Sequence, residues 1–215
     1  MAGQVRADAR AAFEQEAHEI DRAIASRLDS YKELLWDLRG LFHTPQPVTR
    51  RQFRDFVDSL DLEQRNPAIT TVNYGELVAS ADLERFERRV RNDRSLDPAG
   101  YPAFKVFPRR QPRPTHEVLV YLEPFASMGA SFGIDMTQRP SARFEELRRS
   151  GAFLSSGELV DHQPGLPLAL RLGVYRRTGS LATPQEREAA YIGSVGMGFS
   201  LLKLIEEAVP HDLLA

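Results

Sequence analysis

The stretch that decides the fold runs from Val118 to Asp135 and reads VLVYLEPFASMGASFGID. Its first five residues are aliphatic or aromatic and rich in valine, which is typical of a buried strand. Small residues and two glycines follow, and the stretch ends on the carboxylate of Asp135. Such a segment can be a turn that carries a nucleophilic serine, the lip of a small-molecule pocket, or plain packing between a strand and a helix.

Length and composition are those of an ordinary folded protein. The chain has 215 residues, of which 42% are hydrophobic and 27% charged, and its formal net charge is -2. That length can bury the core of one large domain or two small ones. The small net charge creates no field that would attract nucleic acid, so no nucleic-acid partner is expected.

The absence of cysteine excludes disulfides, zinc–thiolate sites and thiol catalysis. No stretch reaches the roughly 18 apolar residues of a membrane span, and the first ten residues lack the apolar region of a signal peptide. We therefore expect either a cytosolic protein or a segment whose flanking transmembrane helices lie outside this sequence.

Residues 4–42 predict one long helix, because no proline or glycine interrupts them before Gly40. Apolar side chains recur at alternating spacings of three and four, which is a heptad pattern with a break at Arg27. From Leu28 onward the apolar stripe widens, as expected for a helix that also packs on a globular body. The pattern favours a stalk that pairs with a partner chain, although a bundle helix would also explain it. The apolar positions are Phe13, Ala17, Ile20, Ile24, Tyr31, Leu34, Leu38 and Leu41.

Short strands and helices are expected after the stalk. Thr49 and Gln52 have the spacing of a capping box for the first of these helices, and Ser80 is expected to cap another. Because hairpins connect the strands as often as helices do, we expect an α+β fold with an antiparallel sheet. The expected strands are 67–78, 103–107, 116–122, 153–160, 166–174 and 191–199, with a turn at 163–165; the expected helices are 49–60, 80–90, 141–150, 184–190 and 201–209.

The sequence offers weak signals for catalysis. Residues 129–133 match the G-x-S-x-G elbow of serine hydrolases around Ser131, but five residues separate this motif from the strand. Asp161 and His162 are adjacent, so on a strand they would point to opposite faces, and His211 lies in a polar tail. The five histidines show no metal-ligand spacing. We therefore expect no enzyme, no cofactor and no metal, and keep a hydrolase using Ser131 as a weak alternative.

Several motifs in order resemble the CHASE domain, over about residues 30–205. CHASE domains are extracytoplasmic sensors of receptor histidine kinases, diguanylate cyclases, phosphodiesterases and adenylate cyclases. The motifs are Pro-x-Ile at 67–69, the segment 124–135 with its Gly-x-Asp ending, Arg-Pro at 139–140 with a charged helix ending at Gly151, Gly-Val-Tyr-Arg-Arg at 173–177, the run 181–187, and the glycine-rich strand closing on Phe199.

The resemblance implies a long stalk helix followed by tandem PAS-like modules with antiparallel sheets. Residues 1–44 would be the stalk and dimerisation helix, 45–180 the membrane-distal ligand-binding module, and 181–215 part of a smaller membrane-proximal module leading to a second membrane helix. The chain would then be the periplasmic part of a bacterial inner-membrane receptor, a homodimer through its first helix, with a histidine kinase or a cyclic-di-GMP enzyme as its output.

The ligand implied by the resemblance is a small molecule, adenine-like or otherwise planar. Plant relatives read adenine with an aspartate near the end of the strand that corresponds to 103–107, where this chain has Phe107-Pro108-Arg109. A structural dimerisation module without its own ligand is the alternative. The residues expected to bind the ligand are Tyr74, Phe104, Val106, Tyr121, Phe132, Asp135, Ser155, Leu170 and Leu172; Asp135 could instead cap the turn that follows it.

Overall fold

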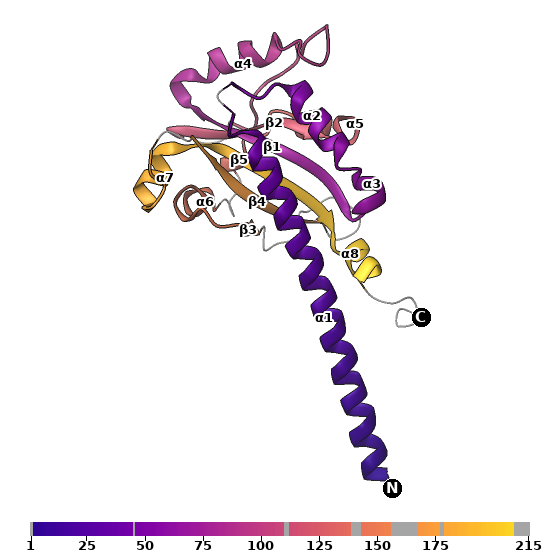
Figure 1. The fold of residues 1–215 in the computed structure, drawn as a ribbon. Helices are drawn as coiled ribbons and strands as arrows, with labels where there is room; N and C mark the ends of the chain where they lie inside the picture. Colours follow the sequence, from indigo (N-terminus) through magenta and orange to yellow (C-terminus); the bar gives the residue numbers. More distant parts are fainter. Residues whose placement is uncertain are drawn as a thin grey trace.

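A computed structural model of the chain describes residues 2–44, 46–109, 112–138, 143–155, 167–176 and 179–208. It is an α+β fold, in which one antiparallel sheet with strand order β2-β1-β5-β4-β3 is packed against helices. The long helix α1 crosses the sheet and extends far beyond it toward the N-terminus (Figure 1). The predicted α+β class and antiparallel sheet are confirmed.

The described elements follow the expected order, except that residues 103–107 form no strand and that two short helices, Leu62–Arg65 and Phe125–Met128, were not expected. The strands are β1 (Ile69–Ala79), β2 (Thr115–Glu123), β3 (Leu154–Ser155), β4 (Pro167–Tyr175) and β5 (Tyr191–Ser200). The α-helices are α1 (Ala2–Leu41), α2 (Arg50–Ser59), α3 (Leu62–Arg65), α4 (Leu83–Arg91), α5 (Phe125–Met128), α6 (Phe144–Ser150), α7 (Pro184–Ala190) and α8 (Leu201–Ala208). Three short 3-10 helices are η1 (Ser80–Asp82), η2 (Gly129–Ser131) and η3 (Met136–Gln138).

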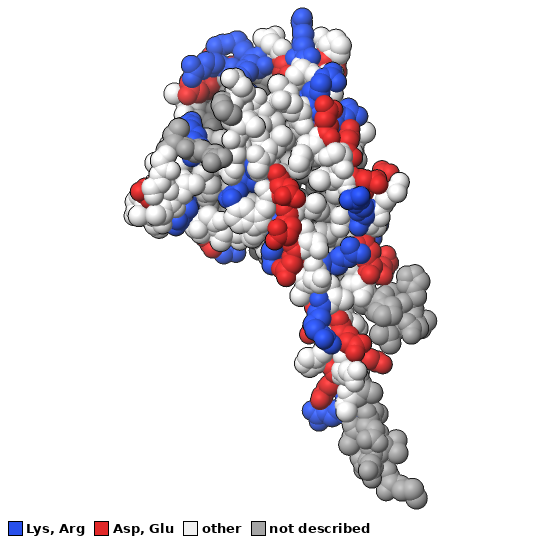
Figure 2. Space-filling model, viewed as in Figure 1, with Lys and Arg blue, Asp and Glu red and all other residues white. Residues whose placement is uncertain are grey.

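The second half of α1 packs on the sheet, whereas most of the described side chains in its first half are exposed. Tyr31, Leu35 and Leu38 are fully buried against the body, whereas Phe13 is 70% exposed. Charged side chains of both signs line the protruding part of α1 (Figure 2). No helix within the described ranges is long and apolar enough to cross a membrane.

The capping box predicted for the second helix is present. Thr49 Oγ1 accepts a hydrogen bond from the backbone N–H of Gln52, and Gln52 Oε1 accepts one from the backbone N–H of Thr49. These bonds satisfy two backbone groups that the start of a helix leaves unpaired. The helix start is therefore fixed locally, one residue before Arg50.

Two local predictions are wrong. Residues 103–107 form no strand; Phe107 makes only an isolated bridge to Ile134, and the backbone N–H of Val106 donates instead to Glu87 Oε1 at 2.9 Å. The Glu87 carboxylate thus supplies the acceptor that a neighbouring strand would have provided for this N–H. Ser80 does not cap α4, since its hydroxyl faces the Arg113 carbonyl and His116. The turn predicted at 163–165 lies outside the described residues.

The described strands belong to one sheet. Strand β5, from the segment assigned by sequence to a second module, lies between β1 and β4 and pairs with both. The arrangement as tandem PAS-like modules is not confirmed; the described residues of both assigned segments share this sheet.

Gly133 shows why the opening stretch needs its second glycine. Its φ is +96, a conformation that residues with a side chain rarely adopt, and an added Cβ would collide with the Lys105 carbonyl. The Gly133 backbone also makes two hydrogen bonds to other segments of the same chain. Its N–H donates to the Leu119 carbonyl and its carbonyl accepts from the Phe107 N–H, both at 2.9 Å. The stretch is thereby folded back along β2.

Candidate functional site

A cavity of about 380 Å3 lies where α2 and α4 meet the sheet at β1 and β2. We call it the arginine cavity. Its walls are the segment before α2 with Val48, the start of α2, Glu76 of β1, Val120 and Tyr121 of β2, Arg89 and Val90 of α4, and the loop 92–95. Its volume falls in the range of small-molecule pockets, which begins at roughly 300 Å3.

Arg50 is the most unusual lining residue. It is the first residue of α2 and only 3% exposed. Its Nη1 donates to the Val120 carbonyl at 2.6 Å, and its Nε donates to Asp93 Oδ2 at 3.3 Å. Its Nη2 is buried and has no hydrogen-bond partner among the described residues. The guanidinium of a buried cation is thus anchored at two nitrogens and has no partner at the third in the described part of the chain.

Aromatic rings surround the guanidinium of Arg50. Its central carbon lies 4.4 Å from the ring centroid of Tyr101, 5.0 Å from that of Tyr121 and 4.8 Å from that of Phe132. The ring faces stabilise the positive charge without providing an in-plane hydrogen-bond acceptor. The opening stretch contributes Tyr121 and Phe132 to this environment, so its fold back along β2 shapes the wall behind the cavity.

The loop 92–95 is tied to the start of α2. Besides the Arg50–Asp93 ion pair, Arg51 Nε donates to the Ser95 carbonyl at 2.9 Å. Burial alone would raise the pKa of Asp93, but its contacts with Ser95 and the charge of Arg50 hold that pKa below its usual value. Asp93 therefore stays a carboxylate and keeps the loop closed over α2.

Four of the predicted ligand-binding residues gather around this region. Tyr121 lines the cavity and donates through its hydroxyl to the Val48 carbonyl at 2.8 Å. Tyr74 lies beside it in β1, with ring centroids 5.8 Å apart. Phe104 and Phe132 pack on one another with ring centroids 4.6 Å apart.

The other predicted residues lie elsewhere. Val106 is buried beside Glu87 of α4, and Leu170 and Leu172 are buried on β4. Ser155 is exposed on β3, at the far edge of the sheet from β2. Leu172 lies two strands away from Tyr74, with Val195 of β5 between them. A ligand-binding role for any of the predicted residues stays a prediction.

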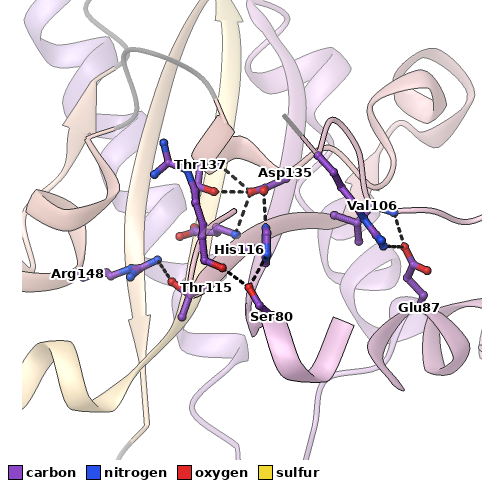
Figure 3. Close-up of polar contacts among 11 residues, drawn as sticks. Ser80, Glu87, Val106, Thr115, His116, Asp135, Thr137 and Arg148 are labelled. Atoms are coloured by element: carbon purple, nitrogen blue, oxygen red, sulfur yellow. Dashed lines mark hydrogen bonds and ion pairs between the residues drawn. The ribbon is translucent and has the colours of Figure 1, made fainter. Parts of the chain in front are cut away.

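Asp135 is fully buried in a polar network rather than on the cavity wall (Figure 3). Its Oδ1 accepts from the Thr137 N–H at 3.0 Å and the Thr137 hydroxyl at 2.7 Å, so it caps the turn that follows. Its Oδ2 lies 2.7 Å from His116 Nδ1, and His116 Nε2 lies 2.9 Å from the Ser80 hydroxyl.

Hydroxyl, imidazole and carboxylate here follow the order of a hydrolase triad. The Ser80 hydroxyl, however, lies against the Arg113 carbonyl, and the Ser80 N–H donates to the Pro114 carbonyl at 3.0 Å. The network therefore joins the end of β1, the start of β2 and the end of the opening stretch. Its geometry is that of a structural clamp.

The hydrolase alternative finds little support around Ser131. Ser131 ends η2, whereas the buried imidazole of His116 is bonded to Ser80 and Asp135. His162 and His211, which the sequence reasoning considered and disfavoured as triad partners, lie outside the described residues. In the described part of the chain no group of three or more metal-ligating side chains occurs.

A second buried carboxylate lies on the other side of β2. Glu117 is fully buried and accepts from the Tyr191 hydroxyl at 2.8 Å and from the Ser194 hydroxyl. Burial raises the pKa of Glu117, and the charges of Arg171 and Arg148 oppose that rise.

A larger hollow of about 650 Å3 opens between α2, α3 and the start of β1. Its lining carries four carboxylates and one lysine, and its buried unpartnered group is the neutral hydroxyl of Thr71. Burying a cationic N–H without an acceptor costs more free energy than burying an unpaired hydroxyl. We therefore assign the candidate site to the arginine cavity.

Arg50, Asp93 and Ser95 were missed by sequence reasoning. One signal was present: α2 begins with Arg50 and Arg51 and has no acidic residue in its first turn. Positive charges near a helix N-terminus interact unfavourably with the helix dipole. A pair of arginines at that position therefore indicates that their side chains bind groups outside the helix.

Comparison with known families agrees with the resemblance in the sequence. The family model for the CHASE domain matches residues 46–214, which is most of the chain. No curated protein matches the chain.

Proposed function

The chain belongs to the CHASE domain family of extracytoplasmic sensor domains, and we propose that it is the periplasmic ligand-sensing domain of a bacterial transmembrane receptor. CHASE domains are sensors and not catalysts. The ligand is a small molecule that binds in the arginine cavity. The observation that carries this proposal is the buried Arg50, whose Nη2 has no partner among the described residues and which lines a cavity of small-molecule size.

Signal transfer would run from the cavity to α1 through packed aromatic rings. Tyr121 lines the cavity, Tyr74 packs on Tyr121, and Phe42 packs on Tyr74 with ring centroids 4.2 Å apart. Phe42 follows the last residue of α1 directly. A ligand that favours one arrangement of the cavity shifts the population of α1 positions toward that arrangement.

The exposed first half of α1 would pair with the same helix of a second copy. Its apolar residues recur at heptad spacing, and Phe13 is 70% exposed. In the full receptor, this helix pair passes a shift to membrane helices and then to a histidine kinase or cyclic-di-GMP output.

A thermal-shift screen with a broad collection of metabolites tests the proposal. At saturation, a ligand should stabilise the chain by about 2 to 4 kcal/mol. Replacing Asn92, an exposed lining residue, by Trp should fill the entrance and abolish that stabilisation.

The matched control is Arg88→Trp, which places the same indole ring on the exposed face of α4 outside the cavity lining. Ligand binding should survive this change. Absence of any stabilising compound would favour the alternative, a dimerisation module without its own ligand. Binding that survives Asn92→Trp would place the ligand elsewhere.

A further inference from the structure

The guanidinium of Arg50 is buried with one nitrogen unsatisfied. Nη1 and Nε have partners in Val120 and Asp93, whereas Nη2 has none among the described residues. Proteins rarely leave a buried polar atom unpaired, and the cost is greatest for a charged group. An acceptor supplied from outside the chain would remove that cost.

A buried hydroxyl beside Asp93 lines the same cavity. Ser95 Oγ is buried, and it lies near the Asp93 carboxylate without making a hydrogen bond of good geometry to any described atom. A hydroxyl and a guanidinium N–H together suit a ligand group with two acceptor oxygens.

The charges around the cavity point to an anion. Its lining carries three arginines, Arg50, Arg89 and Arg94, against the two carboxylates of Glu76 and Asp93. Arg89 binds Glu76 at 2.6 Å, and Arg50 binds Asp93 at 3.3 Å. Arg94 is exposed and forms no ion pair within the described ranges.

We propose that the ligand of this sensor is a small organic carboxylate whose acidic group is bound by Arg50 Nη2 and Ser95 Oγ. The inference rests on the proposed function and specifies its ligand class. A carboxylate supplies two acceptors and the missing negative charge. The ligand's body lies against Tyr121, Val48 and Val90, the apolar part of the lining. An uncharged planar ring could supply an acceptor to Arg50 but not the counter-charge.

Matched pairs of acids and amides test this proposal. Sodium acetate, butyrate, benzoate, phenylacetate and hippurate are titrated at constant ionic strength, each beside its primary amide, by thermal shift and calorimetry. At least one carboxylate should bind at least tenfold more tightly than its amide. Increasing the salt concentration should weaken binding of the carboxylate and leave binding of the amide unchanged.

Variants at the anchor separate the carboxylate contact from a general loss of fold. Ser95→Ala removes one hydroxyl and should weaken carboxylate binding about tenfold, since a hydrogen bond to a charged group is lost. Arg50→Lys keeps the positive charge but loses the Nη2 donor of the planar guanidinium, and should weaken carboxylate binding further. The control Arg54→Gln removes a half-exposed arginine of α2 outside the cavity and should change nothing.

The outcomes of these experiments distinguish a wrong ligand class from the absence of any ligand site. Amides that bind as tightly as their acids, with binding blocked by Asn92→Trp, would overturn the carboxylate assignment and leave a ligand site in the cavity. Carboxylate binding unaffected by Ser95→Ala and Arg50→Lys would also overturn it. If neither the acids, nor the amides, nor the metabolite collection stabilises the wild-type chain, both proposals fail.

Discussion

The ring of Phe42 stacks on the ring of Tyr74 with centroids 4.2 Å apart and planes 28° apart. Phe42 follows α1, and Tyr74 belongs to β1, whose ring neighbour Tyr121 lines the arginine cavity. A single aromatic ring therefore separates the cavity wall from the end of the stalk helix. This contact joins the ring that packs on the cavity wall to the residue that directly follows α1.

Phe42→Leu should weaken the docking of α1. The change loses the ring stack and part of the packing on Phe53, so the free energy of unfolding should fall by about 1 to 2 kcal/mol. Urea unfolding followed by circular dichroism measures it. Phe13→Leu is the control, because Phe13 is 70% exposed and its change should leave the unfolding midpoint of the monomer unaltered. Equal losses in both variants would contradict the docking role of Phe42.

Charges placed on the exposed stripe of α1 should separate the predicted homodimer. Phe13→Asp and Ile20→Asp put carboxylates at heptad positions, where they would be desolvated between two helices. Sedimentation velocity should show dimers for the wild type and monomers for the double variant at micromolar concentration. Glu19→Asp and Arg22→Lys, on exposed neighbouring positions, should leave the dimer intact. A wild-type monomer at high concentration would refute pairing through α1.

Gly133→Ala should destabilise the chain far more than Gly129→Ala. At Gly133 the positive φ of +96 strains any side chain, and the new methyl group would meet the Lys105 carbonyl, so a loss of at least about 2 kcal/mol is expected. At Gly129 φ is -57 and the nearest atom, on the Phe125 ring, lies at 3.7 Å, so a change within about 1 kcal/mol is expected. Denaturant midpoints compare the two; similar values would show that the turn tolerates side chains.

The buried Glu117 should make stability fall as pH rises. Its pKa is raised in the folded chain by burial, against the opposing effects of Arg171, Ser194, Tyr191 and Arg148. In the unfolded chain the pKa is about 4.3. The folded state therefore holds the proton more tightly, and this contribution is complete below the unfolded pKa and is lost as pH rises through the folded pKa.

Glu117→Gln removes that titration. The free energy of unfolding of the wild type minus that of the variant should decrease from about pH 4 upward, by about 1.4 kcal/mol for each unit of pKa difference, and then level off. Urea unfolding of both chains between pH 4 and 8 measures this difference. A difference that increases with pH would mean that the hydrogen bonds to the anion outweigh its burial.

Some parts of this protein could be predicted from local sequence. The heptad spacing predicted α1, the Thr49–Gln52 pair predicted the start of α2, and Tyr191–Ser200 formed the strand that its pattern indicated. The segment 103–107 looked like a strand by alternation alone, but Glu87 satisfies the N–H of Val106 from 19 residues away. Local alternation cannot show which acceptor a backbone group will find.

The sequence by itself determined the long helix, the antiparallel α+β class and the family, because each depends on periodicity or on motifs in order along the chain. Only the tertiary structure decided the site. Arg50 contacts Val120 across 70 positions and Asp93 across 43, and its unpaired buried nitrogen arises only when these contacts are in place. An unpaired buried charge is a property of the assembled cavity, so no stretch of residues read alone could reveal it.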